Sequence, residues 1–368
     1  MKSVNVTEPF LPPIEEYIEH LKGIWERNWL TNQGPVVQEL EQKLQAYHQL
    51  QMPVHCVANG SLGLLIALKA LGVKGEVITT PFSYVATTAC PLWEGCTVKF
   101  ADIEPDTLTI DPRAVEAAIT PQTEAILATH VFGNPCDVEA LDAIAAKHGL
   151  AMIYDAAHAF GVRYKGKSIL EYGDASMVSL HATKLMHSVE GGFVVAKDSA
   201  VSDKIEWMRR FGHKGTDDFH GVGVNAKLSE LHAAMGLCCL NHVSEVFERR
   251  RLCSQYYDQR LFSEGAKTKV NTKLGPGIQL RHGAEKNYSY YPVIFDNEEA
   301  VIRCIENLQK ELIFPRRYFY PVLNKVGFKI LESDFGVSES IARRILCLPL
   351  SAQMCERRLE AIVDAVLQ

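Results

Sequence analysis

The sequence lacks the long apolar run that a membrane-spanning helix needs. No stretch of eighteen consecutive apolar residues occurs in its 368 residues, whereas a helix needs about 20 to cross a bilayer. The first nine residues also lack the apolar core of a secretory signal peptide. We therefore expect a cytoplasmic protein that makes no contact with a membrane.

An excess of positive charge is also missing. The chain has 38 Lys and Arg residues against 44 Asp and Glu residues, which gives a net charge of −6. Non-specific binding to nucleic acid depends on neutralising phosphates, so no nucleic-acid partner is expected. The basic run 249–251 falls on a predicted helix, where a solvated face or a subunit contact is the simpler interpretation.

The ten cysteines do not follow a metal-binding pattern. They form no Cys-x-x-Cys pair, and no histidine cluster has zinc spacing. Several lie within apolar stretches, where a thiol acts as a small buried side chain, so we expect reduced thiols and no metal. A Gly-x-Gly-x-x-Gly motif does not follow the first predicted strand, 54–58, which removes the main support for a dinucleotide-binding enzyme.

What is present is an alternation of short apolar strands with helix-length segments. This order is typical of a largely parallel sheet with helices on both faces. The expected strands are 54–58, 76–80, 97–103, 124–132, 150–155, 175–181 and 191–197, and the expected helices between them are 61–72, 83–94, 112–118 and 137–148.

Further elements are expected on either side of this alternating region. Helical spacing of apolar residues predicts helices over 14–29 and 35–48, and residues 199–262 are mostly helical apart from a glycine-rich interruption at 212–223. The remainder combines strands 288–295 and 345–348 with helices 297–312 and 352–366. Because the chain exceeds the usual size of a single core, we expect an α/β large domain with an N-terminal arm (1–245) and a smaller C-terminal α+β domain (246–368).

A carboxylate and an amine follow two of the predicted strands. Asp155 ends the apolar run 150–154, and Lys184 comes shortly after the run 175–180. Open α/β sheets bind ligands at the carboxyl ends of their strands. Pyridoxal phosphate chemistry needs an amine for a Schiff base and a carboxylate that keeps the pyridine nitrogen protonated. The pair therefore predicts a pyridoxal phosphate site.

The surrounding motifs strengthen this prediction. The segments Asp155–Gly161, Ser179–Lys184 and Glu190–Gly192 resemble those of the DegT-type nucleotide-sugar aminotransferases. The resemblance extends over nearly the whole chain and includes 59–61, 80–84, 223–230 and 316–321. It implies the fold type I of pyridoxal phosphate-dependent transferases, as in the aspartate aminotransferase superfamily.

The resemblance also implies roles around the cofactor ring. Lys184 would form the Schiff base, and a lysine here favours transamination over the dehydration that relatives with histidine catalyse. Asp155 would face the pyridine nitrogen, and His158 would contact the ring hydroxyl. Tyr84 matches an aromatic position over the pyridoxal face, although the sequence fits a core tyrosine nearly as well.

The phosphate of the cofactor would lie at a helix N-terminus. Gly60 and Ser61 precede the apolar helix 62–71, and helix N-termini attract anions, although an ordinary helix cap explains the same residues. By resemblance, Ser61 and Ser179 bind this phosphate. Asn225 would reach the phosphate of the neighbouring subunit's cofactor, which implies a homodimer with shared active sites.

The substrate-binding residues are less clear from the sequence. Arg316 and Tyr318 lie in a block that resembles a region near the family's active site, and arginine pairs well with a pyrophosphate. Since adjacent strand residues point in opposite directions, we expect only one of Arg316 and Arg317 to face the ligand. The remaining candidates are Thr31 and Asn32 in a loop resembling a sugar-pocket loop, and His187 and Glu190 in the turn after the lysine.

The resemblance implies transfer of an amino group from L-glutamate to a keto group on a nucleotide-linked 6-deoxy sugar. The motifs are most similar to those of enzymes that aminate dTDP-4-oxo-6-deoxy-D-glucose at C4. The product, dTDP-4-amino-4,6-dideoxy-D-glucose, is a precursor of surface polysaccharides such as O-antigen. Amination at C3, a GDP- or UDP-linked sugar, and a pyridoxal phosphate-bound regulator remain open alternatives.

Overall fold

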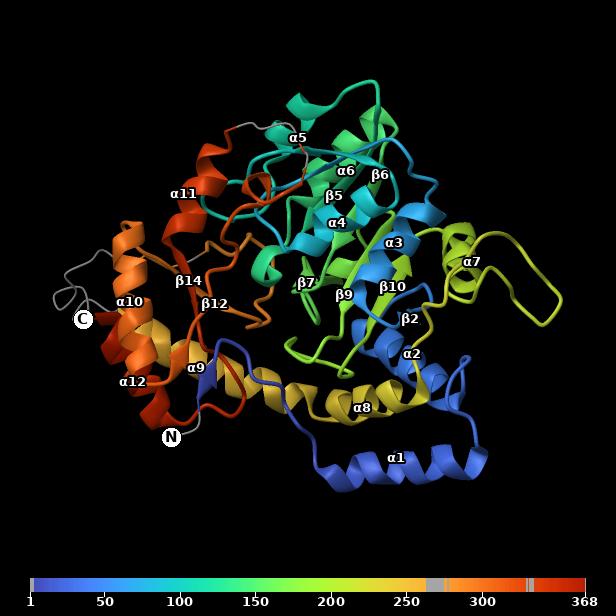
Figure 1. Ribbon diagram of the computed structural model, residues 1–368, viewed down its shortest axis with the longest axis horizontal. Coiled ribbons are helices and arrows are strands. Elements are labelled where there is room, and N and C mark those ends of the chain that lie inside the picture. Colours follow the sequence, from blue (N-terminus) through green and yellow to red (C-terminus); the bar gives the residue numbers. More distant parts are fainter. Residues whose placement is uncertain (1–2, 263–274, 277, 329, 331–333, 368) are drawn as a thin grey trace.

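The computed structural model describes residues 3–262, 275–276, 278–328, 330 and 334–367. A seven-stranded sheet forms the centre of the molecule, in the order β2-β10-β9-β6-β5-β3-β4 (Figure 1). All neighbouring pairs are parallel except those of β10, which runs antiparallel to β2 and β9. The strands are β2 (His55–Val57), β3 (Glu76–Thr79), β4 (Thr97–Phe100), β5 (Thr123–Thr129), β6 (Ala151–Asp155), β9 (Ala175–Ser179) and β10 (Gly192–Ala196).

Both faces of this sheet are buried, because successive residues of each strand pack into different apolar clusters. In β5, Ile126 and Ala128 join the cluster with α2 and α6. Their neighbours Ala125 and Leu127 join the cluster with α3 and α7 on the other face. The covering helices are α2 (Pro35–His48), α3 (Gly60–Ala70), α4 (Val85–Trp93), α5 (Pro112–Ala118), α6 (Val138–His148), α7 (Ser199–Met208) and α8 (Glu230–Asn241).

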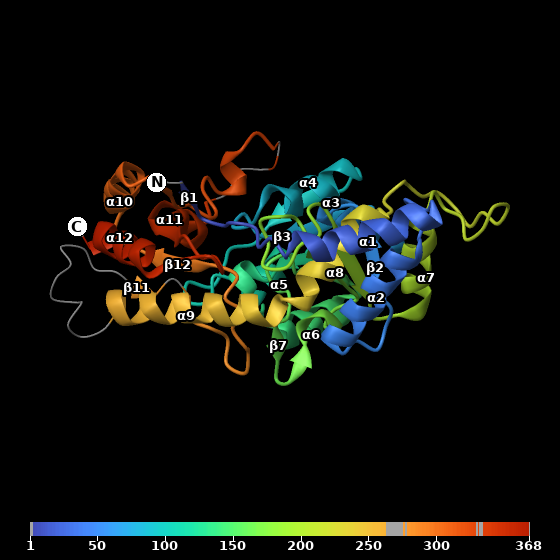
Figure 2. The same ribbon diagram turned by 90° about the horizontal axis from the view of Figure 1, so that it is seen from below.

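The C-terminal part has its own apolar core. The long helix α9 (Val243–Phe262) leads from α8 toward this part (Figure 2) and packs on α12 (Glu356–Leu367). A three-stranded sheet, β11-β12-β14, lies beside these helices. The strands of this sheet are β11 (Gly275–Pro276), β12 (Tyr291–Ile294) and β14 (Ile345–Leu348). The C-terminal part also contains α10 (Glu298–Lys310), α11 (Gly336–Arg344) and β13 (Ile313–Phe314).

The N-terminal arm is divided between the two parts of the molecule. Helix α1 (Ile14–Arg27) contacts α8, whereas β1 (Val4–Asn5) pairs in parallel with β13. The sequence predicts that the whole arm belongs to the large domain, residues 1–245. The predicted domain boundary, Glu245, lies in the first turn of α9. The arm therefore connects the large sheet region to the C-terminal core.

The α/β fold with a mostly parallel sheet is as predicted from the alternating pattern. The elements that the sequence did not predict include β1, β13, α11 and the hairpin β7 (Arg163–Tyr164) with β8 (Lys167–Ser168). Two-residue strands are too short to show a hydrophobic period. In the described part of the chain no helix is long and apolar enough to cross a membrane, and no group of metal-ligating side chains gathers. All ten cysteines are free, and nine are buried.

Candidate active site

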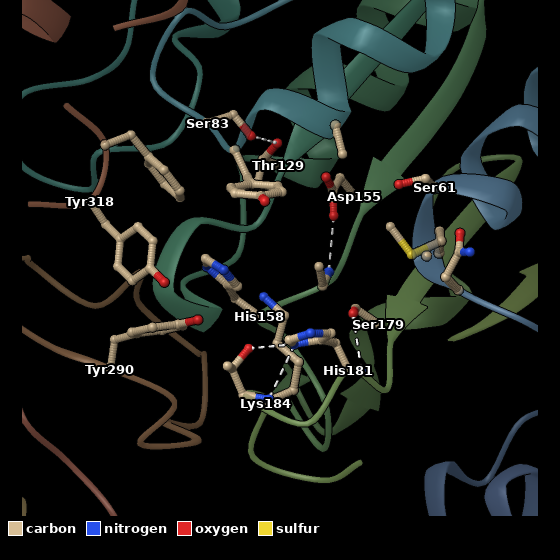
Figure 3. A pocket seen from close by; sticks show the side chains of 18 of the residues that line it. Ser61, Ser83, Thr129, Asp155, His158, Ser179, His181, Lys184, Tyr290 and Tyr318 are labelled. Atoms are coloured by element: carbon tan, nitrogen blue, oxygen red, sulfur yellow. Dashed lines mark hydrogen bonds between the residues drawn. The ribbon is translucent and has the colours of Figure 1, made fainter. Parts of the chain in front are cut away.

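A cavity of about 510 Å³ opens where β5, β6 and β9 end (Figure 3). Thr129, Asp155 and Ser179 are the last residues of these three strands, and all three line the cavity. The structure therefore brings polar side chains together at the carboxyl edge of the sheet, as open α/β sheets do. The predicted site residues that line it are Gly60, Ser61, Tyr84, Asp155, His158, Ser179, Lys184, Glu190, Arg316 and Tyr318.

The carboxylate of Asp155 is almost completely buried at the bottom of this cavity. Its Oδ2 accepts a hydrogen bond from the Thr87 hydroxyl at 2.7 Å, and its Oδ1 accepts one from the Ala157 N–H at 3.0 Å. Burial raises the pKa of Asp155, and the Thr87 and Ala157 hydrogen bonds and the nearby Lys184 act in the opposite direction. A cationic ring nitrogen placed here would favour the ionised carboxylate.

The amine of Lys184 lies in the loop between β9 and β10, opposite this carboxylate (Figure 3). Burial, assisted by the nearby Arg316 cation, lowers its pKa to about 8, while Asp155 and Tyr84 act to raise it. The loop is fixed locally, since the Lys184 N–H donates to the His181 carbonyl at 2.8 Å. Near neutral pH a useful fraction of this amine is unprotonated and can act as a nucleophile.

We expect the reactivity of Lys184 to rise through a midpoint near pH 8, because only the unprotonated amine is nucleophilic. Cofactor-free protein is pulse-labelled with an amine-directed reagent from pH 6 to pH 10, and the Lys184 peptide is quantified by mass spectrometry. The exposed Lys147 in the same digest is the reference. A Lys184 midpoint above pH 10 would contradict the low pKa.

His158 is buried between aromatic rings beside the lysine. Its Nδ1 accepts from the Phe132 N–H at 3.2 Å, and its ring lies 4.5 Å from that of Tyr290 and 5.9 Å from that of Phe319. Burial lowers the pKa of His158 well below its usual value, and the nearby Lys184 cation lowers it further. The ring is therefore neutral at pH 7. With Nδ1 accepting, Nε2 carries the proton and can donate to a ligand oxygen.

The first turn of α3 forms the anion-binding end of the cavity. Asn59 caps the helix, and its side chain accepts from the Leu62 N–H at 2.9 Å. A Cβ at Gly60 would lie 3.0 Å from the Met177 sulfur and 3.4 Å from Ser179 Cβ. The absent side chain lets the helix end approach β9, so Ser61 and Ser179 line the same cavity. A phosphate fits this arrangement of N–H and hydroxyl donors.

Only one of the two adjacent arginines faces the cavity. Arg316 lines it and lies 4.7 Å from the ring of Tyr318. Arg317 points elsewhere, where its guanidinium forms an ion pair with Glu298 at 2.6 Å. Tyr318 and Tyr290 stand edge to face at 5.4 Å and form one wall with Arg316. This wall offers a cation and two phenol groups to a ligand.

Glu190 lines the cavity opposite a histidine that the sequence analysis did not select. The Nδ1 of His181 accepts from the Thr183 N–H at 3.2 Å, and its Nε2 lies 3.6 Å from a Glu190 carboxylate oxygen. His187, by contrast, lies outside the cavity, where its Nε2 lies 2.7 Å from the Phe10 carbonyl. His187 thus ties the loop that carries Lys184 to the N-terminal arm.

Besides His187, three predicted residues do not reach the cavity of their own chain. Thr31 and Asn32 are exposed in the loop between α1 and α2. Asn225 is exposed after the loop 211–224, and its side-chain oxygen accepts from Lys227 Nζ at 2.5 Å. None of the three lines the cavity.

Several lining residues were not selected from the sequence. His181 and Thr183 lie within the motif around Lys184 that the sequence analysis quotes, so that motif contained a signal for them. Thr129 was detectable as a polar residue near the end of a predicted strand. Phe319 lies in the block 316–321 that carries part of the family resemblance, so that block contained a signal for it. Tyr290 comes from a distant part of the chain, and nothing in its local sequence marks it.

An amine with a lowered pKa and a buried carboxylate in one cavity of a mostly parallel α/β sheet are the pair that a group-transfer enzyme of the aminotransferase type needs. The chain belongs to the DegT/DnrJ/EryC1/StrS aminotransferase family, whose model matches residues 13–367. Members of this family are pyridoxal phosphate-dependent aminotransferases, and the predicted fold and enzyme class are thereby confirmed.

Three relatives resemble the chain over nearly its full length. Two are dTDP-4-amino-4,6-dideoxy-D-glucose transaminases. The protein from Shigella dysenteriae is 39% identical and the match covers 99% of this chain and 98% of the relative, and the one from Escherichia coli is 37% identical and covers 100% and 98%. The crystal structure of DesI, solved in the presence of its TDP-sugar product, superimposes with a TM-score of 0.91 at 30% identity, covering 99% of this chain and 92% of DesI.

Proposed function

We propose that this aminotransferase binds pyridoxal phosphate and transfers an amino group from L-glutamate to C4 of dTDP-4-oxo-6-deoxy-D-glucose. The product would be dTDP-4-amino-4,6-dideoxy-D-glucose, for the synthesis of surface polysaccharides. The observation that carries the proposal is the buried pair of Lys184 and Asp155 in one cavity. The two full-length relatives named for this product support the choice of sugar.

The side chains that line the cavity suit each part of pyridoxal phosphate. Ser61, Ser179 and the first turn of α3 would hold the phosphate, and Asp155 would hold the ring nitrogen. His158 would donate from Nε2 to the ring hydroxyl oxygen, since its Nδ1 is occupied by the Phe132 N–H. When bound, the cofactor supplies an aldehyde to which an amine can attach and a ring that accepts electrons.

Lys184, Tyr84 and Arg316 would each have a separate role in the reaction. Lys184 Nζ, with its pKa lowered by burial, can release and regain a proton close to neutral pH. Tyr84, which is half exposed, would cover the ring at the cavity mouth. The Arg316 cation, beside Tyr318, is suited to an anionic part of a substrate such as a carboxylate or a pyrophosphate.

A panel assay tests the proposed substrate. Purified enzyme with pyridoxal phosphate and L-glutamate is incubated with dTDP-linked, GDP-linked and UDP-linked keto-sugars, and the products are assigned by NMR. We expect turnover of dTDP-4-oxo-6-deoxy-D-glucose with nitrogen at C4. Nitrogen at C3, or a preference for a GDP- or UDP-linked sugar, would replace the proposed substrate. Absence of turnover with every sugar would favour a regulator that binds the cofactor without catalysis.

We propose further that two chains pair and complete each other's sites, in the cytoplasm. Asn225, Thr31 and Asn32 are exposed outside the cavity of their own chain. The loop 211–224 extends away from the body (Figures 1 and 2) and exposes apolar side chains, including Phe219 and Val222. An exposed apolar loop beside Asn225, which does not line the cavity of its own chain, suits a subunit contact.

The cytoplasmic location is supported by the cysteines, since free thiols fit a reducing compartment.

Mixing two impaired variants tests the shared site. If Asn225 serves the neighbouring chain, Lys184→Ala and Asn225→Ala homodimers are each impaired. Each mixed dimer then contains one site with both native residues, so co-expression should restore up to roughly half of the activity per mixed dimer. The assay is run at limiting cofactor, because one lost phosphate hydrogen bond costs only about 1 kcal/mol. No rescue despite proven subunit exchange would exclude the shared site.

A further inference from the structure

Three hydroxyl groups form an unbroken row that ends on the Asp155 carboxylate. Thr129 Oγ1 lies 2.9 Å from Ser83 Oγ, which lies 2.7 Å from Thr87 Oγ1, and Thr87 donates to Asp155 Oδ2 at 2.7 Å. All four side chains are almost completely buried. Thr87 does not line the cavity, so water cannot replace its hydroxyl at low cost.

The fold, rather than any local motif, assembles this row. Thr129 and Asp155 are register partners at the ends of the parallel strands β5 and β6. Ser83 comes from the turn after β3, and Thr87 from the first turn of α4. Figure 3 shows Ser83 and Thr129 joined by a hydrogen bond to one side of Asp155. The ends of three neighbouring strands thus converge on one carboxylate.

The row has a direction when Asp155 is ionised. A carboxylate only accepts hydrogen bonds, so Thr87 must donate its single hydroxyl proton to Asp155. Thr87 then accepts from Ser83, and Ser83 accepts from Thr129. Aligned hydroxyls polarise one another, which strengthens the last bond in the row.

We propose that the hydroxyls of Thr129, Ser83 and Thr87 form a directed hydrogen-bond chain that keeps the Asp155 carboxylate ionised and aimed at the cavity. Thr87 is then a positioning residue, because it acts on the cofactor ring only through Asp155. The proposal rests on the proposed function in one respect, the pairing of Asp155 with the ring nitrogen. The hydroxyl chain itself belongs to the protein without cofactor.

Burial alone would favour a neutral Asp155 that cannot hold a cationic ring nitrogen. Its pKa is raised by burial, and the Thr87 hydrogen bond is the largest influence that lowers it again. The titratable groups around it are Lys184 from the loop after β9, Cys90 from α4 and His158 from the loop after β6. Among the described residues Lys184 is the one cation that acts on Asp155 directly, and its charge falls away above pH 8. The hydroxyl chain provides support that does not depend on that charge.

The neighbouring residue provides a matched control. Thr88 is as buried as Thr87 on the same helix, yet its hydroxyl has no hydrogen-bond partner among the described residues. Thr87→Val and Thr88→Val are therefore the same change of shape on adjacent positions, and only the first removes a hydrogen bond. Thr87→Ser keeps the hydroxyl and should restore the native behaviour.

The first measurement follows the ring nitrogen itself. Each variant is loaded with pyridoxal phosphate labelled with nitrogen-15 in the ring, and the nitrogen chemical shift is recorded against pH. In Thr87→Val we expect the proton between Asp155 and the ring nitrogen to shift toward Asp155. The nitrogen signal at neutral pH should therefore move toward that of the unprotonated ring relative to Thr88→Val, with the ratio of the two forms changed by about 10- to 100-fold, the size expected for one hydrogen bond to a charged group. The turnover number should fall by about 10- to 100-fold over the same comparison. Identical titration of the two variants would overturn the proposal.

The second measurement needs no cofactor and so separates this proposal from the proposed function. The free energy of unfolding of cofactor-free Thr87→Val and Thr88→Val is compared from pH 5 to pH 9. We expect Thr87→Val to be the less stable, with the difference growing as pH rises, because hydrogen bonds to an ionised group are the stronger ones. A difference that does not change with pH would mean that Thr87 has only a structural role. This result is readable even if the variant binds no cofactor or the enzyme acts on another sugar.

Discussion

Lys184→Ala should abolish transamination while leaving the fold intact. The side chain lines a cavity of about 510 Å³, so its truncation enlarges existing space and leaves no packed neighbour unsupported. Removing a nucleophile that acts directly on the reacting group costs on the order of 10⁴-fold or more in turnover. The measurement is the rate of amino transfer from L-glutamate, together with the mass of the protein after borohydride reduction in the presence of pyridoxal phosphate. Wild-type protein should gain the mass of the cofactor on the Lys184 peptide, and the variant should not.

Two controls separate loss of the amine from loss of charge or of fold. Lys184→Arg keeps a cation but presents no amine that can lose its proton, so it should be as inactive as the alanine variant. Lys147→Ala removes a lysine whose amine is exposed and paired with Glu116 and should leave the rate unchanged. If Lys184→Ala turned over at full rate without an added amine, the assignment of this residue would be wrong.

Asp155→Asn should bind pyridoxal phosphate and turn over about 10³- to 10⁴-fold more slowly, the size of effect seen when one preorganised electrostatic contact is removed from an active site. The amide keeps the shape of the side chain but carries no charge, so it cannot keep the ring nitrogen protonated. Steady-state rates and cofactor affinity are measured for both proteins. Near wild-type turnover would mean that the ring does not face Asp155.

The free energy of unfolding of Asp155→Asn should be higher than that of the wild type, although its turnover is lower. Burial raises the pKa of Asp155 in the folded protein, so ionising it disfavours folding, and wild-type stability falls as pH rises through the window above the usual pKa of an aspartate. The substituted amide does not titrate, so the cofactor-free Asp155→Asn variant should gain stability relative to wild type over that window. Denaturation of cofactor-free protein from pH 4 to pH 9 checks the sign. A constant difference would contradict the burial argument.

A variant of Asp174, which lies directly before β9 and contacts the start of β6, is the control. Asp174 accepts a hydrogen bond from the Met152 N–H at 2.8 Å, near the start of β6 and away from the cavity. Asp174→Asn should lower stability modestly, by about 1 kcal/mol for the altered hydrogen bond. Its turnover should stay close to that of the wild type. A large loss of activity in this variant would show that general damage to β6 explains the effect of Asp155→Asn.

The sequence by itself determined the α/β fold class and selected Asp155 and Lys184 as the candidate catalytic pair. Short apolar runs and period-3.6 patterns are local, so the strands of the central sheet and the helices between them, from about residue 54 to residue 197, could be placed to within a few residues of their observed ends. Asp155 and Lys184 were recognisable because each follows a strand in a distinctive motif. The N-terminal arm shows the limit of this reasoning, since β1 pairs with β13 across more than 300 residues, and no local pattern marks two-residue strands.

Only the tertiary structure decided which side chains surround Asp155 and Lys184. Tyr290 and Phe319 reach His158 from the C-terminal part of the chain, and Ser83, Thr87 and Thr129 meet behind Asp155 because three strands end at the same edge. The orientation of Arg316 toward the cavity, with Arg317 paired to Glu298, likewise depends on packing. Local sequence selects which residues carry charge and hydroxyls. Burial and hydrogen-bond partners, which set the pKa values of Lys184 and Asp155, exist only once distant segments have packed together.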